Sequence, residues 1–262
     1  KLAELPPLQP ITRTSFVAAP IVVANSAIRS TLDNAAPRDF NGANDNPVSG
    51  LLSKADIGLT VGRGPMTVTG RTDGLIITTP FAGSAKVTGQ LAAQAGNLTG
   101  QLGGLLNQAL GQQIGNLAGR VLDQKAEVRG QVSVTTRPTF TPDWRINPNM
   151  TANVSVADGG LQVAGLKLNL AGEVKPLIDN AVNDQMAKLQ ERLRNDPTIE
   201  QTARREWAKA CRSIPLGGGQ TGLPNLYLEM KPVRAAAAQP KIDPAAVTLT
   251  IGIQAETRIV PT

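Results

Sequence analysis

One stretch, from Val174 to Ile214, carries apolar residues at the three- and four-residue steps of an α-helix. This spacing keeps a narrow apolar face on one side of a helix, and charged residues fill the other side. Asp196 and Pro197 interrupt the pattern, because they end one helix and begin another. Asp196 is predicted to cap the second helix, and Pro197 is predicted to occupy its first position. We therefore expect two consecutive amphipathic helices, ended by Pro215 and the glycines at 217–219. The apolar stripe consists of Val174, Ile178, Val182, Met186, Leu189, Leu193, Ile199, Ala203, Trp207, Cys211 and Ile214.

Much of the remaining chain follows a two-residue period, which is typical of strands with one apolar face. The clearest run extends from Val247 to Ile259 and would span about 43 Å as a strand. A strand of that length belongs to a wide sheet that twists and curls. Other alternating segments cover residues 57–61, 66–68, 75–89, 128–134, 144–156, 161–170 and 226–230. We expect turns at 62–65 and 72–74 between the first of these strands.

The first part of the chain gives three further predictions. Ser15 to Val23 is expected to form a strand, and Pro20 within it favours the edge of a sheet. Ala24 to Ala36 is expected to form a short helix. Arg38 to Gly50 is rich in Asn and Asp, and we interpret it as a loop of Asx turns; a calcium site is the less favoured alternative, because the spacing does not fit an EF-hand.

A glycine-rich segment, Leu91 to Leu122, has leucines at helical spacing, including Leu98, Leu102 and Leu105. Each glycine inside a helix costs about 1 kcal/mol relative to alanine, so such a helix needs support from a surface. It is interpreted either as a helix docked on the chain's own sheet or as a movable flap that touches a membrane.

Strands and helices coexist without the alternation of parallel βαβ units. We therefore predict an α+β fold in which a long, highly curved antiparallel sheet wraps around the long amphipathic helix, with the glycine-rich segment as an additional helical part. The chain shows no clear break in composition, and residues 1–262 are predicted to form one module.

The composition argues against several classes of function. The sequence contains no histidine, which removes the commonest general base and metal ligand, and its single Cys211 is expected to be a buried apolar side chain on the stripe. We find no catalytic motif and predict neither an enzyme nor a metal or cofactor site. Aromatic residues make up only 3% of the chain, which weighs against nucleic-acid binding. The net charge of +6 is scattered, although weak contact with an anionic membrane surface remains an option.

What remains is an extended aliphatic surface. In one interpretation sheet and helix form an ordinary packed core, and the protein is a non-enzymatic scaffold. In the other, closure is incomplete and a groove accepts an acyl chain or a polycyclic lipid. The predicted lining residues are Ile178, Val182, Met186, Leu189, Leu193, Ile57, Leu59, Val61, Leu98, Leu102, Leu105, Val247, Leu249, Ile251 and Ile253.

Several short motifs, in this order, resemble an uncharacterised bacterial envelope family, the domain of unknown function four-four-zero-three. They are the segments 15–20 and 28–37, Arg63-Gly64 with Thr79-Pro80, Asp143-Trp144, the helix from Ala203 to Trp207, and Ile214-Pro215. That family is in turn similar to the tubular lipid-binding superfamily, in which lipid lies in the seam between a curved sheet and a long helix.

The resemblance implies a periplasmic carrier or sensor of apolar lipid, with an export signal that has been removed. It also implies that this chain is the N-terminal half of a longer protein. It supplies no catalytic residues, and it leaves protein partners and the identity of the lipid unknown.

Overall fold

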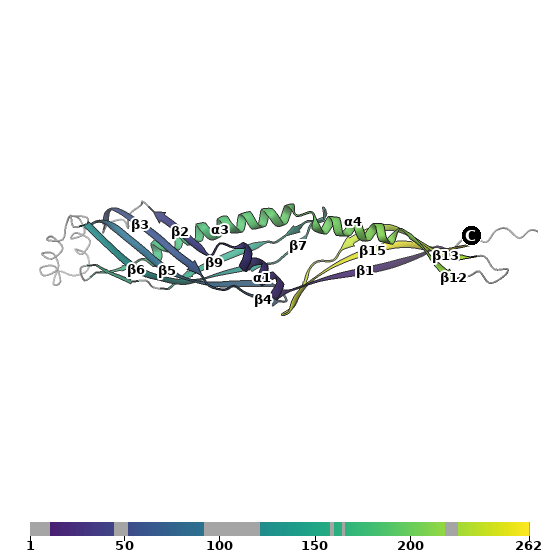
Figure 1. The fold of residues 1–262 in the computed structure, drawn as a ribbon, viewed down its shortest axis with the longest axis horizontal. Helices are drawn as coiled ribbons and strands as arrows, with labels where there is room; N and C mark the ends of the chain where they lie inside the picture. Colours follow the sequence, from purple (N-terminus) through teal and green to yellow (C-terminus); the bar gives the residue numbers. More distant parts are fainter. Residues whose placement is uncertain are drawn as a thin grey trace, which may run out of the picture.

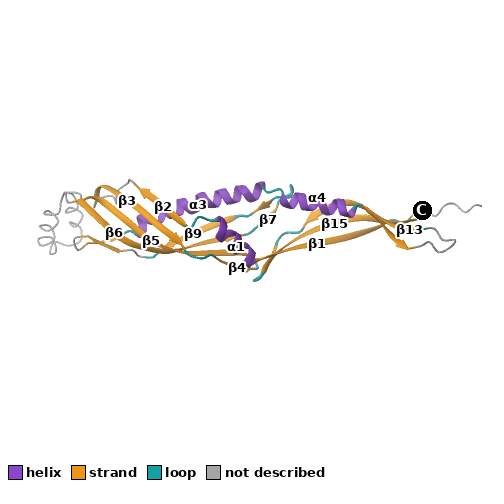
Figure 2. Cartoon of the chain, viewed as in Figure 1, coloured by secondary structure: helices purple, strands orange, loops and turns teal. Residues whose placement is uncertain are grey.

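The computed structural model describes residues 11–44, 52–91, 121–157, 160–163, 166–217 and 225–261. The molecule is elongated, and two antiparallel sheets follow one another along its length (Figure 1). Helix α3 (Ala171–Asn195) lies along the first sheet and helix α4 (Thr198–Ala210) along the second. Figure 2 shows both helices on the same side of the molecule. The predicted α+β class, with a curled antiparallel sheet and a long helix broken once, is confirmed.

The first sheet has the strand order β2-β3-β5-β6-β9. Its 18-residue strand β5 also pairs with the short strand β4. Because β3 and β4 pair with successive parts of β5, the chain continues in one direction through Gly64. The turn predicted at 62–65 is therefore wrong, because the chain does not reverse its direction there. The turn predicted at 72–74 is confirmed, since it connects β4 to β5. The strands are β2 (Asp39–Asn44), β3 (Leu52–Arg63), β4 (Thr67–Arg71), β5 (Gly74–Leu91), β6 (Val121–Thr136) and β9 (Met150–Val156).

The second sheet has the strand order β1-β15-β13-β12, and β14 pairs with β15. Strand β1 lies at the edge, as Pro20 predicts. Thr250 lies opposite Pro20 and accepts a hydrogen bond from the backbone of Ala238, so its backbone groups face away from β1. The nitrogen of Pro20 consequently points to the open edge, where no ladder bond is lost. The strands are β1 (Arg13–Ala24), β12 (Arg212–Gly217), β13 (Leu226–Ala237), β14 (Lys241–Ile242) and β15 (Ala246–Pro261).

Short elements connect these parts. Helix α1 (Asn25–Ala35) follows β1 and leads into the first sheet, which confirms the predicted short helix. Two small hairpins complete the described fold: β7 (Thr139–Phe140) with β8 (Ile146–Asn147), and β10 (Gly160–Val163) with β11 (Leu166–Asn169). The glycine-rich residues 92–120 lie outside the described residues.

Two further predictions about local structure are wrong. The supposed loop 38–50 contains strand β2, which pairs from Asp39 to Asn44 with β3 and packs Phe40 against the core; residues 45–50 lie outside the described part. The helical stripe does not reach Ile214, because α4 ends at Ala210 and the chain joins the second sheet as β12. In both places, pairing with a neighbouring strand overrides a weak local preference.

The main core lies between the first sheet and the N-terminal half of α3. Val174 is 0% and Ile178 is 4% exposed, and both belong to one core cluster with aliphatic side chains of β3, β5, β6 and β9. This burial explains why a helix with a narrow apolar face is stable here, because the face is removed from water along its first turns.

Candidate functional site

The predicted lining residues on α3 change in burial along the helix. Ile178 is fully inside the core, and Val182 packs against it while half-buried. Met186, Leu189 and Leu193 continue the same face and are all half-buried. The aliphatic face of α3 is thus covered completely at its start and only partly toward its end.

The predicted residues on β3 are core residues of the first sheet. Ile57 and Leu59 are each 1% exposed, Val61 is 6% exposed, and all three belong to the cluster that contains Ile178. The structure therefore brings these residues together with the start of α3. Their proposed contact with a ligand stays a prediction.

The predicted residues on β15 belong to the second sheet and not to that cluster. Val247, Ile251 and Ile253 are buried, and Leu249 is half-buried. The apolar lining predicted from the sequence is hence divided between two sheets under one bent helix. Leu98, Leu102 and Leu105 lie outside the described residues.

A pocket of about 680 Å³ lies where α4 meets the β7–β8 connection and strand β13. We call it the junction pocket. Four of its residues come from one face of α4, at steps of three and four residues. Its lining residues are Asp143, Trp144, Arg145, Glu200, Ala203, Arg204, Trp207 and Ala235.

A tight turn presents Trp144 to this pocket. Trp144 has a φ of 62°, in the left-handed region that non-glycine residues rarely occupy. Thr141 closes the turn, since its backbone carbonyl accepts from the Trp144 N–H at 3.1 Å and its hydroxyl accepts from the Arg145 N–H at 3.2 Å. Backbone strain of this kind costs on the order of 1–3 kcal/mol and tends to occur at functional sites.

Glu200 organises the positive charges of the junction pocket. One of its carboxylate oxygens lies 3.1 Å from Nη2 of Arg145, and the other accepts two hydrogen bonds from Arg204, at 3.0 and 2.9 Å. Arg145 also donates from Nη1 to the carbonyl of Asp196 at 2.9 Å, at the break between the helices. The three side chains together carry one net positive charge.

Asp143 supplies a separate negative charge. A hydrogen bond from the Thr141 side chain lowers the pKa of Asp143, and its own backbone N–H and the charge of Arg145 lower it further. The Asp143 carboxylate is therefore ionised at neutral pH. Among the residues that the structure describes, no lysine or arginine forms an ion pair with it.

The sequence interpretation missed this pocket because it expected a purely aliphatic lining. The two-residue period predicts a strand at Trp144, whereas Trp144 lies in a turn before β8. The spacing of Glu200, Ala203, Arg204 and Trp207 on one helical face was visible in the sequence, but its partner loop was not. Cys211 is exposed just beyond α4, so its predicted burial is wrong.

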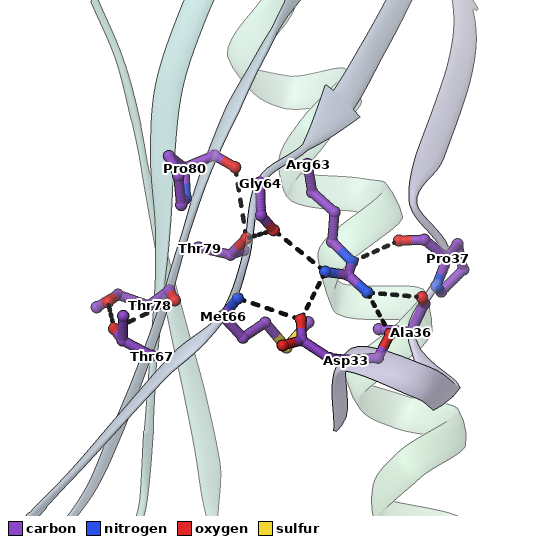
Figure 3. Close-up of polar contacts among 10 residues, drawn as sticks. All are labelled: Asp33, Ala36, Pro37, Arg63, Gly64, Met66, Thr67, Thr78, Thr79 and Pro80. Atoms are coloured by element: carbon purple, nitrogen blue, oxygen red, sulfur yellow. Dashed lines mark hydrogen bonds and ion pairs between the residues drawn. The ribbon is translucent and has the colours of Figure 1, made fainter. Parts of the chain in front are cut away.

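A second polar cluster surrounds Arg63 at the junction of α1, β3 and β4 (Figure 3). Its guanidinium donates to the carbonyls of Asp33, Ala36, Pro37 and Gly64 and to the carboxylate of Asp33, at 2.8 to 3.1 Å. These bonds use the donors of all three nitrogens, so none of the nitrogens is left for a ligand. The cluster fastens α1 to the first sheet.

No group of His, Cys, Asp or Glu residues in the described part of the chain is arranged to hold a metal ion. Within the same ranges, none of the helices combines the length and hydropathy needed to cross a membrane.

No curated protein matches the sequence. A family described as "Domain of unknown function (DUF4403)" matches residues 13–262, which is nearly the whole chain and includes both sheets, the bent helix and the junction pocket. The chain therefore belongs to this family of proteins with a domain of unknown function.

Proposed function

We propose that this chain is a non-enzymatic module that binds an apolar lipid, an acyl chain or a polycyclic lipid, between its curved sheets and the α3–α4 helix. In this proposal it acts in the periplasm as a carrier or sensor of lipid. The location rests on the resemblance of its motifs to a bacterial envelope family.

The observation that carries the proposal is the incomplete burial of the apolar stripe. Met186, Leu189 and Leu193 remain half-buried although they continue the face that is fully covered at Ile178. A lipid chain placed along this part of α3 would remove aliphatic surface from water, at about 25 cal/mol per Å².

The same part of α3 ends close to the junction pocket. Arg194 donates to the side chain of Asn147 in β8, two residues beyond the pocket residue Arg145. A ligand that follows the stripe toward the end of α3 would therefore arrive beside the pocket. The pocket volume of about 680 Å³ falls in the usual range of small-molecule sites.

A second candidate function is a structural scaffold of the cell envelope. It is favoured by the closed packing at the start of α3, where Val174 is 0% and Ile57 and Leu59 are each 1% exposed. A protein with this packing throughout would have no cavity for a lipid, and its surface would bind protein or glycan instead.

Substituting glutamate for apolar residues of the stripe distinguishes the two candidate functions. We expect Leu189→Glu to fold, because the side chain is half-buried, and to lose uptake of a fluorescent fatty acid. Lys188→Glu changes the neighbouring exposed residue and should retain uptake, whereas Ile178→Glu should unfold the protein. Circular dichroism checks the folding of each variant.

Native mass spectrometry of the wild-type protein, purified from the cells that produce it, should show bound lipid. Repeated spectra without lipid, together with no uptake of the fluorescent fatty acid, would exclude the carrier and leave the scaffold.

A further inference from the structure

The junction pocket is lined by charges of both signs together with two indole rings. Arg145 and Arg204 share Glu200, which leaves one net positive charge on these three side chains. Asp143 carries the opposite charge on the β7–β8 connection. The Arg145 and Glu200 side chains are only 25% and 28% exposed, so their pairing is screened less by water than that of a surface pair.

Part of each charge remains available to a ligand. Arg204 binds Glu200 through Nε and Nη2, and its side chain is 77% exposed, so the donors of Nη1 are left for an anion. Asp143 is exposed, and in the described ranges its carboxylate has no cationic partner within ion-pair distance. A ligand with one sign of charge alone would leave either the arginines or Asp143 without an opposite charge.

The tryptophans provide the remaining chemistry. The sequence contains only two tryptophans, and both line this pocket. Indole faces are the best aromatic partners for organic cations, especially alkylated ammonium groups, and they also exclude water from an ion pair. An ammonium group close to Asp143 and the indoles would be bound by both charge and ring faces.

We infer that the junction pocket binds a zwitterion, a phosphate ester that carries an ammonium group, with the phosphate toward Arg204 and the ammonium toward Asp143, Trp144 and Trp207. As the headgroup of a lipid, this ligand deepens the proposed function and rests on it. The same chemistry is present in a free phosphate ester, and the experiment distinguishes the two sources.

Tryptophan fluorescence reports directly on this pocket, because its two indoles are the only ones in the chain. The probes are dihexanoylphosphatidylcholine, dihexanoylphosphatidylglycerol and free phosphocholine. We expect the zwitterionic lipid to change the emission and to bind about tenfold more tightly than the anionic lipid, since only the former satisfies Asp143.

Two variants with matched controls test the orientation. Asp143→Asn should abolish the preference for the zwitterionic lipid, whereas Asp184→Asn, on the exposed side of α3, should preserve it. Arg204→Gln should weaken binding of both lipids about tenfold, whereas Arg205→Gln, the next residue on α4 and outside the pocket lining, should leave it unchanged. Circular dichroism verifies that each variant folds.

Each remaining outcome overturns one idea or both. Equal affinity for the two lipids would overturn the zwitterion pocket and leave lipid binding intact. The same conclusion would follow if the protein took up the fluorescent fatty acid but dihexanoylphosphatidylcholine did not change its tryptophan emission. Binding of phosphocholine as tight as that of the lipid, without fatty-acid uptake, would support the pocket and overturn the lipid carrier. Absence of any binding would overturn both.

Discussion

At the scale of single residues, Arg63 connects three parts of the fold. Its side chain is 12% exposed and donates hydrogen bonds to the last turn of α1, to Pro37 and to Gly64 (Figure 3). The carbonyls at the end of a helix have no partners within the helix. Arg63 supplies donors to two of them, at Asp33 and Ala36, and so fixes where α1 ends.

Replacing Arg63 by lysine should lower the free energy of unfolding by about 2 kcal/mol, because an ammonium group cannot reach acceptors arranged around a planar guanidinium. Chemical denaturation measures this change. As a control, Arg129→Lys alters an arginine that is 72% exposed and pairs with Glu127, and we expect it to change stability by less than about 0.5 kcal/mol. Equal effects of the two substitutions would contradict the assigned role of Arg63.

The pH dependence of stability should reveal Asp33. The N–H of Met66, followed by the hydrogen bond and charge of Arg63, lowers the pKa of Asp33 below its ordinary value of 3.8. A lowered pKa in the folded state stabilises the protein above pH 3.8, and this contribution is lost as the pH falls through the folded pKa. The stability difference between wild type and Asp33→Asn should therefore shrink below about pH 4. A difference that stays constant from pH 6 to pH 2.5 would refute this assignment.

At the scale of elements, the break between α3 and α4 sets the direction of the second helix. The carboxylate of Asp196 accepts a hydrogen bond from the Thr198 N–H at 2.9 Å, in the first turn of α4. The Thr198 hydroxyl, followed by this N–H, lowers the pKa of Asp196. Arg145 binds the Asp196 carbonyl, so the break is also attached to the turn that carries Trp144. The helix break and the junction pocket are thereby coupled.

The predicted N-cap at Asp196 is wrong by one residue, because Pro197 is the N-cap of α4 and the helix begins at Thr198. Removing the Asp196 carboxylate should nevertheless loosen the start of α4, because the Thr198 N–H loses its acceptor. Asp196→Ala is expected to lower the free energy of unfolding by about 1 kcal/mol and to speed hydrogen exchange at the first amides of α4. Asp184→Ala is the matched control, since it replaces an exposed aspartate inside α3, where alanine is a better helix former. If both variants show the same exchange at Thr198, the hydrogen bond from Thr198 to Asp196 does not stabilise the start of α4.

At the scale of the whole molecule, the two sheets meet at Gly70 of β4. A Cβ atom at this glycine would lie 1.9 Å from the backbone oxygen of Asp243, which precedes β15. Next to this contact, Asn25 is 6% exposed and donates from its side chain to the carbonyl of Pro244 at 3.0 Å. The backbones of the two halves therefore touch where a side chain has no space.

Gly70→Ala should push the two sheets apart and lower the free energy of unfolding by about 2 kcal/mol or more, the effect of overpacking. Gly58→Ala serves as the control, because its added Cβ would have no atom within 4 Å. Thermal denaturation followed by circular dichroism compares the variants. A Gly70→Ala protein as stable as the control would show that the backbones at Gly70 and Asp243 can separate without a loss of stability.

The sequence alone was sufficient for elements that depend on local spacing. The three- and four-residue steps determined α3 and α4, and Asp196 with Pro197 determined their break. Two-residue alternation located the long strands, and Pro20 placed β1 at an edge. These features follow from the geometry of a single helix or strand, so neighbouring residues contain the information.

Only the tertiary structure decided how these elements combine. It divided the apolar strands between two sheets and turned the Asn-rich residues 39–44 into β2. It placed residues 212–214, the expected end of the helix, in β12. It also brought the turn around Trp144 to the face of α4, more than fifty residues later in the chain. Strand pairing and pocket formation depend on contacts between distant segments, and the period of a local pattern does not specify which segments meet.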